Sequence, residues 1–456
     1  MKVFRKFIKA AAFVLAFIVL FGAVSGVLVC PNDYRNYQWV GAFYENERNS
    51  LDAVYIGSSA VYAFWCPAVA WEQNGIAVWN YTSPRQPLVA AKYIIEDCRK
   101  TQKDALYIVN LNRAAMKYDK TAMHYLLDYM PFSINKLLLT EKLCKTAGIE
   151  GEDKVQYFFP FQLYHTRWSS LSARDFSYEP DGTMGSPQYS GFLTGVFEEE
   201  QQEDVILTSE ESEPKQKYID ILNDLLDYCE KNEVKVLFTV NPQIAEDAQR
   251  QSEINFAKEL VTERGFSVAD FYTDFSSLGL DSTQDFYNKA HTNIHGAVKM
   301  TALLSDYLVK NYNLEDKRGK SGYEDWDKAA EKYKKIIASS VVPIELDTAN
   351  RDYTIADVQF TESIFDGEKV CLQWEGSEKA EGYKVYRKTT DEKKGKQSDF
   401  TEVASLGADA LSFEDTDIEK ENGEITYNYV VVPFRTENGV QKWGSFRYKG
   451  VSVTVN

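Results

Sequence analysis

Residues 52–59 have the sequence DAVYIGSS, an apolar run that ends in a glycine and two serines. Such a run predicts a short buried strand followed by a tight turn. Further apolar runs lie at residues 76–81, 105–111, 234–240 and 266–271. Segments with helical spacing separate these runs, and an alternation of this kind predicts a parallel sheet with helices on both faces. The expected helices cover residues 61–72, 86–103, 217–232, 245–264 and 293–312.

The chain outside this alternation divides into further units. We expect an α/β domain at residues 31–315, interrupted by an aromatic-rich insertion at about 113–216. A charged amphipathic helical connector covers residues 316–344. From residue 345 to 456 the strands alternate in hydrophobicity and are separated by polar turns, which predicts a β-sandwich. The strands that carry Trp374, Tyr383 and Tyr427 resemble those of a fibronectin type III domain.

The N-terminal segment has the features of a membrane anchor. Residues 10–29 are uncharged and follow four cations between residues 2 and 9. Twenty helical residues rise about 30 Å, the thickness of the hydrocarbon core of a bilayer. Cations before the run favour a cytoplasmic N-terminus. We therefore expect residues 1–30 to be a single-pass anchor in the cell membrane, with the main domains extracellular; a signal peptide cleaved near residues 23–25 is the alternative.

Composition narrows the classes of function. The formal net charge is −17, from 51 Lys+Arg and 68 Asp+Glu, which argues against nucleic-acid binding because phosphates attract clustered cations. The six cysteines are scattered without any C-x-x-C pair, so they are expected to be buried apolar residues. His291 and His295 are spaced like a helical metal pair, but no third ligand is evident. We expect no metal and no other cofactor.

Two segments offer the groups that a serine nucleophile needs. Ser59 follows the first strand, at the edge where open α/β sheets bind their ligands, and backbone N–H groups at such a turn can stabilise an oxyanion. Residues 285–296, DFYNKAHTNIHG, contain His291, and histidine is suited to accept the serine proton. The alternatives are a helix cap for the serines and a structural role for the histidine.

Together the two segments resemble the SGNH/GDSL hydrolase superfamily, through VYIGSS at residues 54–59 and the late D-F-Y-N-x-x-H-x-N-x-x-G block. The closer resemblance is to its membrane-anchored branch. That branch includes the D-alanyl transfer protein of teichoic acid modification and the alginate-type polysaccharide O-acetyltransferases. SPRQPL at residues 83–88 and YHTRW at residues 164–168 are similar to segments of this branch. The resemblance covers residues 35 to 312.

The resemblance implies roles for individual residues. Ser59 would be the nucleophile and His291 the base. The family places an aspartate three residues before the histidine, where this chain has Asn288, and Asp285 one turn earlier is a candidate substitute. An amide stabilises the imidazolium less than a carboxylate does. Candidates for oxyanion or substrate binding are Ser83, Arg85 at the position of the family's glycine, Gln86, Asn112, His165 and Arg167.

The expected function is therefore that of a surface-exposed serine acyl-ester hydrolase or acyltransferase. Its expected substrate is a cell-envelope polysaccharide or a teichoic-acid-like polymer, and a membrane-bound acyltransferase is a candidate partner. The alternative is a catalytically degenerate module that holds a glycan or an acyltransferase, with the sandwich as an interaction arm. A third interpretation makes the sandwich a spacer only.

Overall fold

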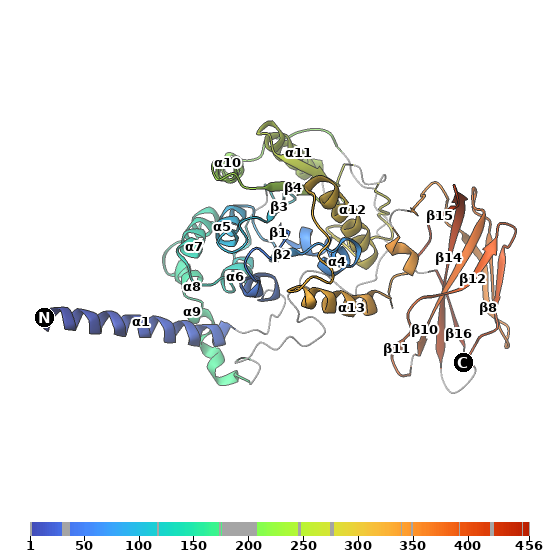
Figure 1. Ribbon diagram of the computed structural model, residues 1–456, viewed down its shortest axis with the longest axis horizontal. Helices are drawn as coiled ribbons and strands as arrows, with labels where there is room; N and C mark the ends of the chain where they lie inside the picture. The colour runs from blue at the N-terminus through green and yellow to red at the C-terminus, as the bar shows by residue number, and fades with distance from the viewer. Residues whose placement is uncertain are drawn as a thin grey trace.

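The computed structural model describes residues 2–29, 37–115, 118–172, 175, 208–244, 248–273, 278–338, 340–347, 350–391, 393–419, 424–448 and 450–455. Cys30 and the acidic stretch at residues 198–204 lie outside the described residues. Figure 1 shows helix α1 (Lys2–Val29) at one end, an α/β body in the middle and a β unit at the other end.

A five-stranded parallel sheet forms the centre of the α/β body, with the strand order β2-β1-β3-β4-β5. Every strand overlaps a run that the sequence predicts, and only β2 extends beyond its run, by one residue, so the expected α/β class is confirmed. The first four strands are almost wholly buried, because helices pack on both faces of the sheet (Figure 1). The strands are β1 (Ala53–Gly57), β2 (Val78–Thr82), β3 (Leu106–Asn110), β4 (Val236–Val240) and β5 (Ser267–Asp270).

The expected helices of the body are present with shifted ends, the largest shift being in α5 (Val89–Cys98, expected at 86–103), and one of them is broken. The single helix expected at residues 61–72 is two helices, because Pro67 follows Cys66, whose backbone is extended (φ −109°, ψ 105°). A residue before proline is driven out of the helical region. The helices and turns of the body are η1 (Tyr37–Gly41), η2 (Ala42–Glu45), α3 (Ser59–Tyr62), α4 (Pro67–Asn74), α5 (Val89–Cys98), α10 (Gln216–Lys231), α11 (Ala248–Glu263), α12 (Ile294–Tyr312), α13 (Glu324–Ala338) and η7 (Pro343–Leu346).

The described part of the insertion is helical and packs against α1. The Phe21 ring lies 5.3 Å from the ring of Phe161, and the Arg167 guanidinium donates to the Leu28 carbonyl oxygen (2.6 Å). The insertion contains α6 (Ala122–Leu127), α7 (Ile134–Ala147), η3 (Gly151–Lys154), α8 (Val155–Phe158), α9 (Phe161–Tyr164) and η4 (His165–Ser170).

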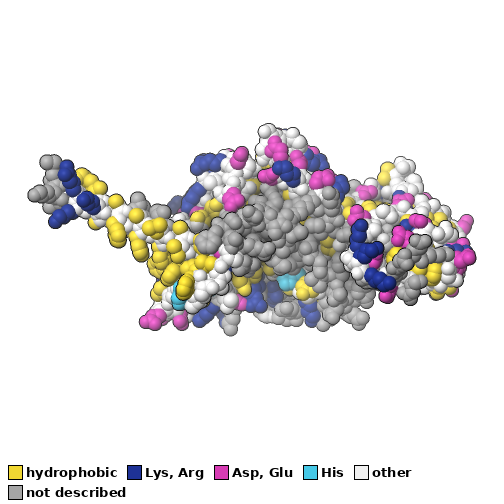
Figure 2. Space-filling model, turned by 90° about the horizontal axis from the view of Figure 1, so that it is seen from below, with side chains coloured by type: hydrophobic (Ala, Val, Ile, Leu, Met, Phe, Trp, Pro, Cys, Tyr) yellow, Lys and Arg dark blue, Asp and Glu magenta, His cyan; other side chains and the backbone are white. Residues whose placement is uncertain are grey.

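Helix α1 projects from the body, and several of its large apolar side chains are exposed (Figures 1 and 2). Within the described residues, no helix combines the length and the apolar character that crossing a membrane requires. The anchor expected over residues 1–30 is therefore not supported by the structure.

The C-terminal unit consists of antiparallel sheets, as the alternating pattern predicts. One sheet joins β10, β11, β12, β14, β15 and β16, and a second has the order β13-β9-β8. Trp374 is buried between them, with its ring 5.7 Å from the ring of Tyr383. The strands are β8 (Gln359–Phe365), β9 (Val370–Glu375), β10 (Gly382–Asp391), β11 (Lys396–Gln397), β12 (Thr401–Gly407), β13 (Ser412–Asp415), β14 (Ile425–Glu437), β15 (Val440–Trp443) and β16 (Val451–Val455).

Candidate active site

Ser59 lies at the carboxyl end of β1, where the chain turns directly into α3. Ser58 is the N-cap of this helix and its hydroxyl accepts a hydrogen bond from the Ala60 N–H (3.3 Å). The Ser59 N–H has no partner among the described residues, as expected for the first residue of a helix. A side chain at Gly57 would place its Cβ 2.6 Å from Val61 and 3.0 Å from Asn110, so glycine permits this close turn.

The segment at residues 83–86 lies beside this turn. The Ser83 N–H donates to the Gly57 carbonyl oxygen (3.4 Å), and the Ser83 hydroxyl donates to the Gln86 side-chain oxygen (3.1 Å). Both side chains are buried and hold the turn together. Arg85 has a φ of +55°, in the left-handed region that favours glycine, and its N–H has no partner among the described residues. Its exposed guanidinium pairs with Asp119. The backbone N–H of Arg85 is therefore the available donor of this segment.

Asn112 holds the ends of β3 and β4 together. Its amide oxygen accepts from the Asn241 N–H (2.8 Å) and the Asn110 amide (2.7 Å), and its amide nitrogen donates to the Asn241 carbonyl oxygen (2.7 Å). The expected oxyanion donor is thus engaged within the fold.

Asn241 continues this buried network to α3, the helix that begins at Ser59, and sequence reasoning missed it. Its amide nitrogen donates to the Ala60 carbonyl oxygen (2.5 Å) and to the Tyr55 hydroxyl (2.9 Å), which also bonds to Thr239 (2.9 Å). The signal was available, since Asn241 precedes a proline directly after a predicted strand. A network of neutral groups therefore supports the turn that carries Ser59.

His291 lies on a short hairpin formed by β6 (Phe286–Asn288) and β7 (His291–Thr292). The Asn288 side-chain oxygen accepts both the Ala290 N–H (2.9 Å) and the His291 Nδ1 hydrogen (2.9 Å). Because the Ala290 N–H can only donate, the amide atom facing it must be oxygen. Nδ1 then carries the hydrogen, and Nε2 is left as the basic nitrogen. Asn288 is therefore the group that orients this imidazole.

Hydrogen bonds hold the hairpin against the helix that begins at Ser59. The Thr292 hydroxyl donates to the Ala63 carbonyl oxygen in the turn that ends α3. The Ile244 N–H donates to the Lys289 carbonyl oxygen (2.8 Å), so the loop after β4 also contacts the hairpin. The structure thus brings together segments that are more than 200 residues apart in the sequence.

Burial and the nearby cation Arg113 both affect the electrostatics of His291. Burial, together with the positive charge of Arg113, lowers the pKa of His291 to about 4. Burial and the charges of Arg250 and Arg85 lower the pKa of Arg113 itself to about 10. Its Nε is buried and has no hydrogen-bond partner among the described residues. Sequence reasoning missed this cation, although it follows Asn112 directly at the end of a predicted strand.

Three other residues that were expected to act in the site have partners other than the His291 imidazole. Asp285 pairs with Lys299 (2.8 Å) and accepts from the Tyr448 hydroxyl (2.9 Å). His165 is exposed and bonds to the Gln162 carbonyl oxygen. Arg167 donates to the Leu28 carbonyl oxygen at the end of α1 and forms an ion pair with Asp175 of the insertion. Within the described ranges, no group of three or more His, Cys, Asp or Glu could hold a metal ion.

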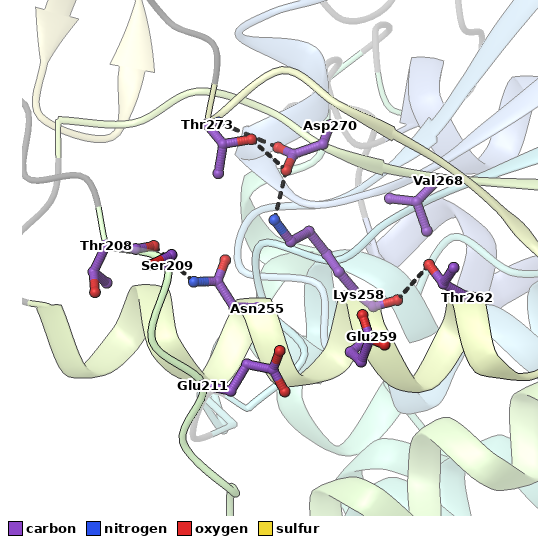
Figure 3. Close-up of a pocket in the computed structure, with 10 residues that line it drawn as sticks. All are labelled: Thr208, Ser209, Glu211, Asn255, Lys258, Glu259, Thr262, Val268, Asp270 and Thr273. Atoms are coloured by element: carbon purple, nitrogen blue, oxygen red, sulfur yellow. Dashed lines mark hydrogen bonds and ion pairs between the residues drawn. The ribbon is translucent and has the colours of Figure 1, made fainter.

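A separate polar cavity of about 340 Å³ lies between α11, β5 and residues 208–211 (Figure 3). Its lysine, Lys258, is paired with Asp270 (2.5 Å), and the Asn255 amide bonds to the Thr208 carbonyl oxygen (2.8 Å). β5 is one of the two edge strands of the sheet, whereas open sheets bind ligands where the strand order reverses, here between β1 and β3. The candidate site at Ser59 is at that reversal.

Comparison with known proteins identifies no family. No protein-family model matches the chain, and no curated protein matches it. A pectate lyase from Pectobacterium carotovorum has a TM-score of 0.16 and 15% identity, over 22% of this chain and 27% of that protein. A gut microbial diltiazem-metabolizing enzyme has a TM-score of 0.22 and 8% identity, over 79% of this chain and 72% of that protein. These similarities are too weak to carry an argument about fold or function.

Proposed function

We propose that the protein is a serine acyl-ester hydrolase or acyltransferase of the SGNH/GDSL type, with Ser59 as nucleophile and His291 as base. The observation that carries the proposal is the set of hydrogen bonds that hold the Asn288–His291 hairpin against α3, which begins at Ser59. A nucleophile needs a base within reach and a third group that orients the base. Asn288 supplies that orientation.

The proposed reaction has two steps. The Ser59 hydroxyl oxygen attacks the acyl carbonyl while His291 Nε2 accepts its proton, and the leaving alcohol then takes this proton. Water or a glycan hydroxyl next attacks the acyl-serine while His291 Nε2 accepts its proton. The bond between the acyl carbon and the Ser59 oxygen then breaks, this oxygen takes the proton back, and a free acid or a new ester is released. The N–H groups of Ser59 and Arg85, which have no partner among the residues that the structure describes, are the candidate donors to the oxyanion.

Labelling of Ser59 tests this proposal. The intact protein is incubated with a fluorophosphonate probe, and its peptides are analysed by mass spectrometry. We expect modification of Ser59, loss of modification and of ester turnover in Ser59→Ala, and retention of both in Ser58→Ala, which removes only a helix cap. Absence of any label on Ser59, with no turnover of acetyl, alanyl or longer acyl esters, contradicts the proposal.

Arg113 favours a polymer that carries negative charge as the substrate. The Arg113 guanidinium is half-buried and its Nε has no hydrogen-bond partner among the described residues, which is unfavourable, and an anionic group beside the ester would pair with it. A teichoic-acid-like polymer or an acidic polysaccharide of the cell envelope has such groups. We expect wild-type protein to prefer anionic to neutral ester substrates, and Arg113→Gln to lose this preference in kcat/KM.

A surface location is part of the same proposal. Phe13, Phe17 and Leu20 expose 72%, 59% and 66% of their surface on α1, and cations precede them in the sequence. Exposed apolar helix faces with adjacent cations bind membranes. We expect the protein to fractionate with membranes and its C-terminal sandwich to be cleaved by protease added to intact cells. Recovery in the soluble fraction contradicts this location, and a membrane-bound acyltransferase partner would then lose its support.

A binding module is the second candidate, and one observation favours it. The low pKa of His291 makes its imidazole a weak base, and Asn288 gives its cation no charge partner. A degenerate site could hold a glycan or an acyltransferase without turnover. Saturable binding of the polymer by an unlabelled, inactive wild-type protein would decide for this candidate.

A further inference from the structure

The C-terminal sandwich contacts the α/β body directly at the hairpin that carries His291. Tyr448 lies in the segment between β15 and β16, and its hydroxyl donates to the Asp285 carboxylate (2.9 Å). Its backbone N–H donates to the Gln284 side-chain oxygen (3.2 Å). Both partners immediately precede β6, and Figure 1 shows the sandwich beside α12. One residue of the sandwich therefore fastens the start of the hairpin.

The base of the hairpin is closed through the same aspartate. The Asn293 N–H donates to the Asp285 carbonyl oxygen (3.0 Å), so the two ends of the hairpin meet here. The Asn293 side chain caps α12 at the His295 N–H (3.0 Å). A side chain at Gly296 would clash with the Asp285 carbonyl oxygen, so glycine permits this close approach. The position of Asp285 thus sets where the hairpin begins and ends.

Buried charges surround the Tyr448 ring. The ring is stacked on His295 with centroids 3.8 Å apart, and His295 Nδ1 is 2.8 Å from the Glu345 carboxylate of η7. Lys299, which pairs with Asp285, lies 5.2 Å from the centre of the same ring. The side chains of Asp285 and Glu345 are completely buried. A cluster of this kind is rigid when all its members are paired, and it is costly to disturb.

We propose that the C-terminal sandwich is a structural part of the candidate active site, and that Tyr448 is a positioning residue for His291. The path runs from the Tyr448 hydroxyl through Asp285 to the hairpin, and from there to the Asn288–His291 bond. The sandwich is then neither a spacer nor solely an interaction arm. The kinetic part of this proposal rests on the proposed function, whereas its structural part does not.

The test compares two tyrosine-to-phenylalanine variants of the full chain. Tyr448→Phe removes the hydroxyl that bonds to Asp285 and keeps the ring on His295. Tyr429→Phe is the matched control, because its buried hydroxyl also donates to an aspartate, Asp415 (2.8 Å), but within the sandwich. We expect amide exchange across residues 285–293 to be about tenfold faster in Tyr448→Phe and unchanged in Tyr429→Phe. Both variants lose a hydrogen bond to a carboxylate, but only the one lost in Tyr448→Phe lies at the hairpin.

Ester turnover gives the second measurement. Tyr448→Phe should lower kcat several-fold with little change in KM, because the base is less well placed while substrate contacts remain. Exchange of the hairpin as slow as in wild type would overturn the proposal, whatever the kinetics. If wild type has no turnover, the proposed function fails and the exchange measurement still decides. Gln284→Ala loosens the same junction from the other side and repeats the test without any change in the sandwich.

Discussion

The two halves of the candidate site are supported by buried polar clusters of different character. The cluster that supports the turn at Ser59 consists of neutral groups: Tyr55, Asn112 and Asn241 form hydrogen bonds at the strand ends. Under the His291 hairpin they are charged, with Asp285 paired to Lys299. An unpaired neutral group costs about 1–3 kcal/mol, whereas breaking a buried ion pair costs about 3–5 kcal/mol. The histidine side should therefore be the more sensitive to substitution.

Asp285→Asn should have the largest effect on stability. The asparagine can still accept from Tyr448, but Lys299 keeps its buried charge without a carboxylate. We expect a loss of about 3–5 kcal/mol in the free energy of unfolding, measured by urea denaturation. Asp227→Asn is the control, since its carboxylate is 67% exposed beside Arg264 and should cost less than about 1 kcal/mol. Equal losses in the two variants would show that the buried pair of Asp285 and Lys299 is no more costly to break than an exposed pair.

Asn241→Ala tests the neutral cluster. It leaves the Tyr55 hydroxyl with one partner fewer and removes the bond to the Ala60 carbonyl oxygen. We expect a loss of about 1–3 kcal/mol in the free energy of unfolding. Asn311→Ala, on an exposed face of α12, should change it by less than about 0.5 kcal/mol. A loss above that of Asp285→Asn would reverse the order of the two halves.

The strands and the helix order of the body could be predicted because each depends on a local pattern. The apolar run at residues 53–57 is buried by helices on both faces, as its composition requires. The break between α3 and α4 could also have been predicted, because a proline follows Cys66. It was missed because the residues on both sides of the proline have helical spacing. The proline alone explains this break, and no long-range contact is needed to account for it.

The candidate site was predictable only where its contacts are short in sequence. Asn288 orients His291 from three residues away. Ser59 follows the first strand after a single residue, Ser58, which is the N-cap of α3. Arg113 and Tyr448 were missed because their roles depend on contacts across the fold. Tyr448 is 163 residues from Asp285, and no periodicity links them. Long-range contacts also explain why two expected roles differ. Asn112 bonds to Asn241 and Asp285 bonds to Lys299 and Tyr448, so both hold the fold together.

Arg113→Gln should change the pH dependence of the histidine side. Under the proposed function His291 acts as a base only when it is neutral, so a pKa of about 4 would keep it active well below pH 6. Loss of the Arg113 charge should return this pKa part of the way towards 6.5, because burial remains the larger cause. The acid limb of kcat/KM then moves to higher pH. Arg85→Gln is the control, since that guanidinium is 64% exposed and pairs with Asp119; an equal shift in both variants would rule out a specific effect of Arg113.

Asn288→Asp should have the smallest effect on turnover. The size of the change in kcat shows how well the amide of Asn288 orients His291. In serine proteases, replacement of the orienting aspartate by asparagine costs about 10⁴ in kcat because the histidine adopts the wrong tautomer. Here the Ala290 N–H fixes the Asn288 oxygen towards Nδ1, so the tautomer is already correct. A carboxylate then adds only its charge, which raises the pKa of His291 and stabilises the imidazolium. We expect turnover to stay similar or to rise by no more than about tenfold, measured as kcat on an acyl ester. A rise of several orders of magnitude would show that the amide does not orient the ring in solution, and a matched Asn288→Ala variant, which has no acceptor, would then be as slow as wild type.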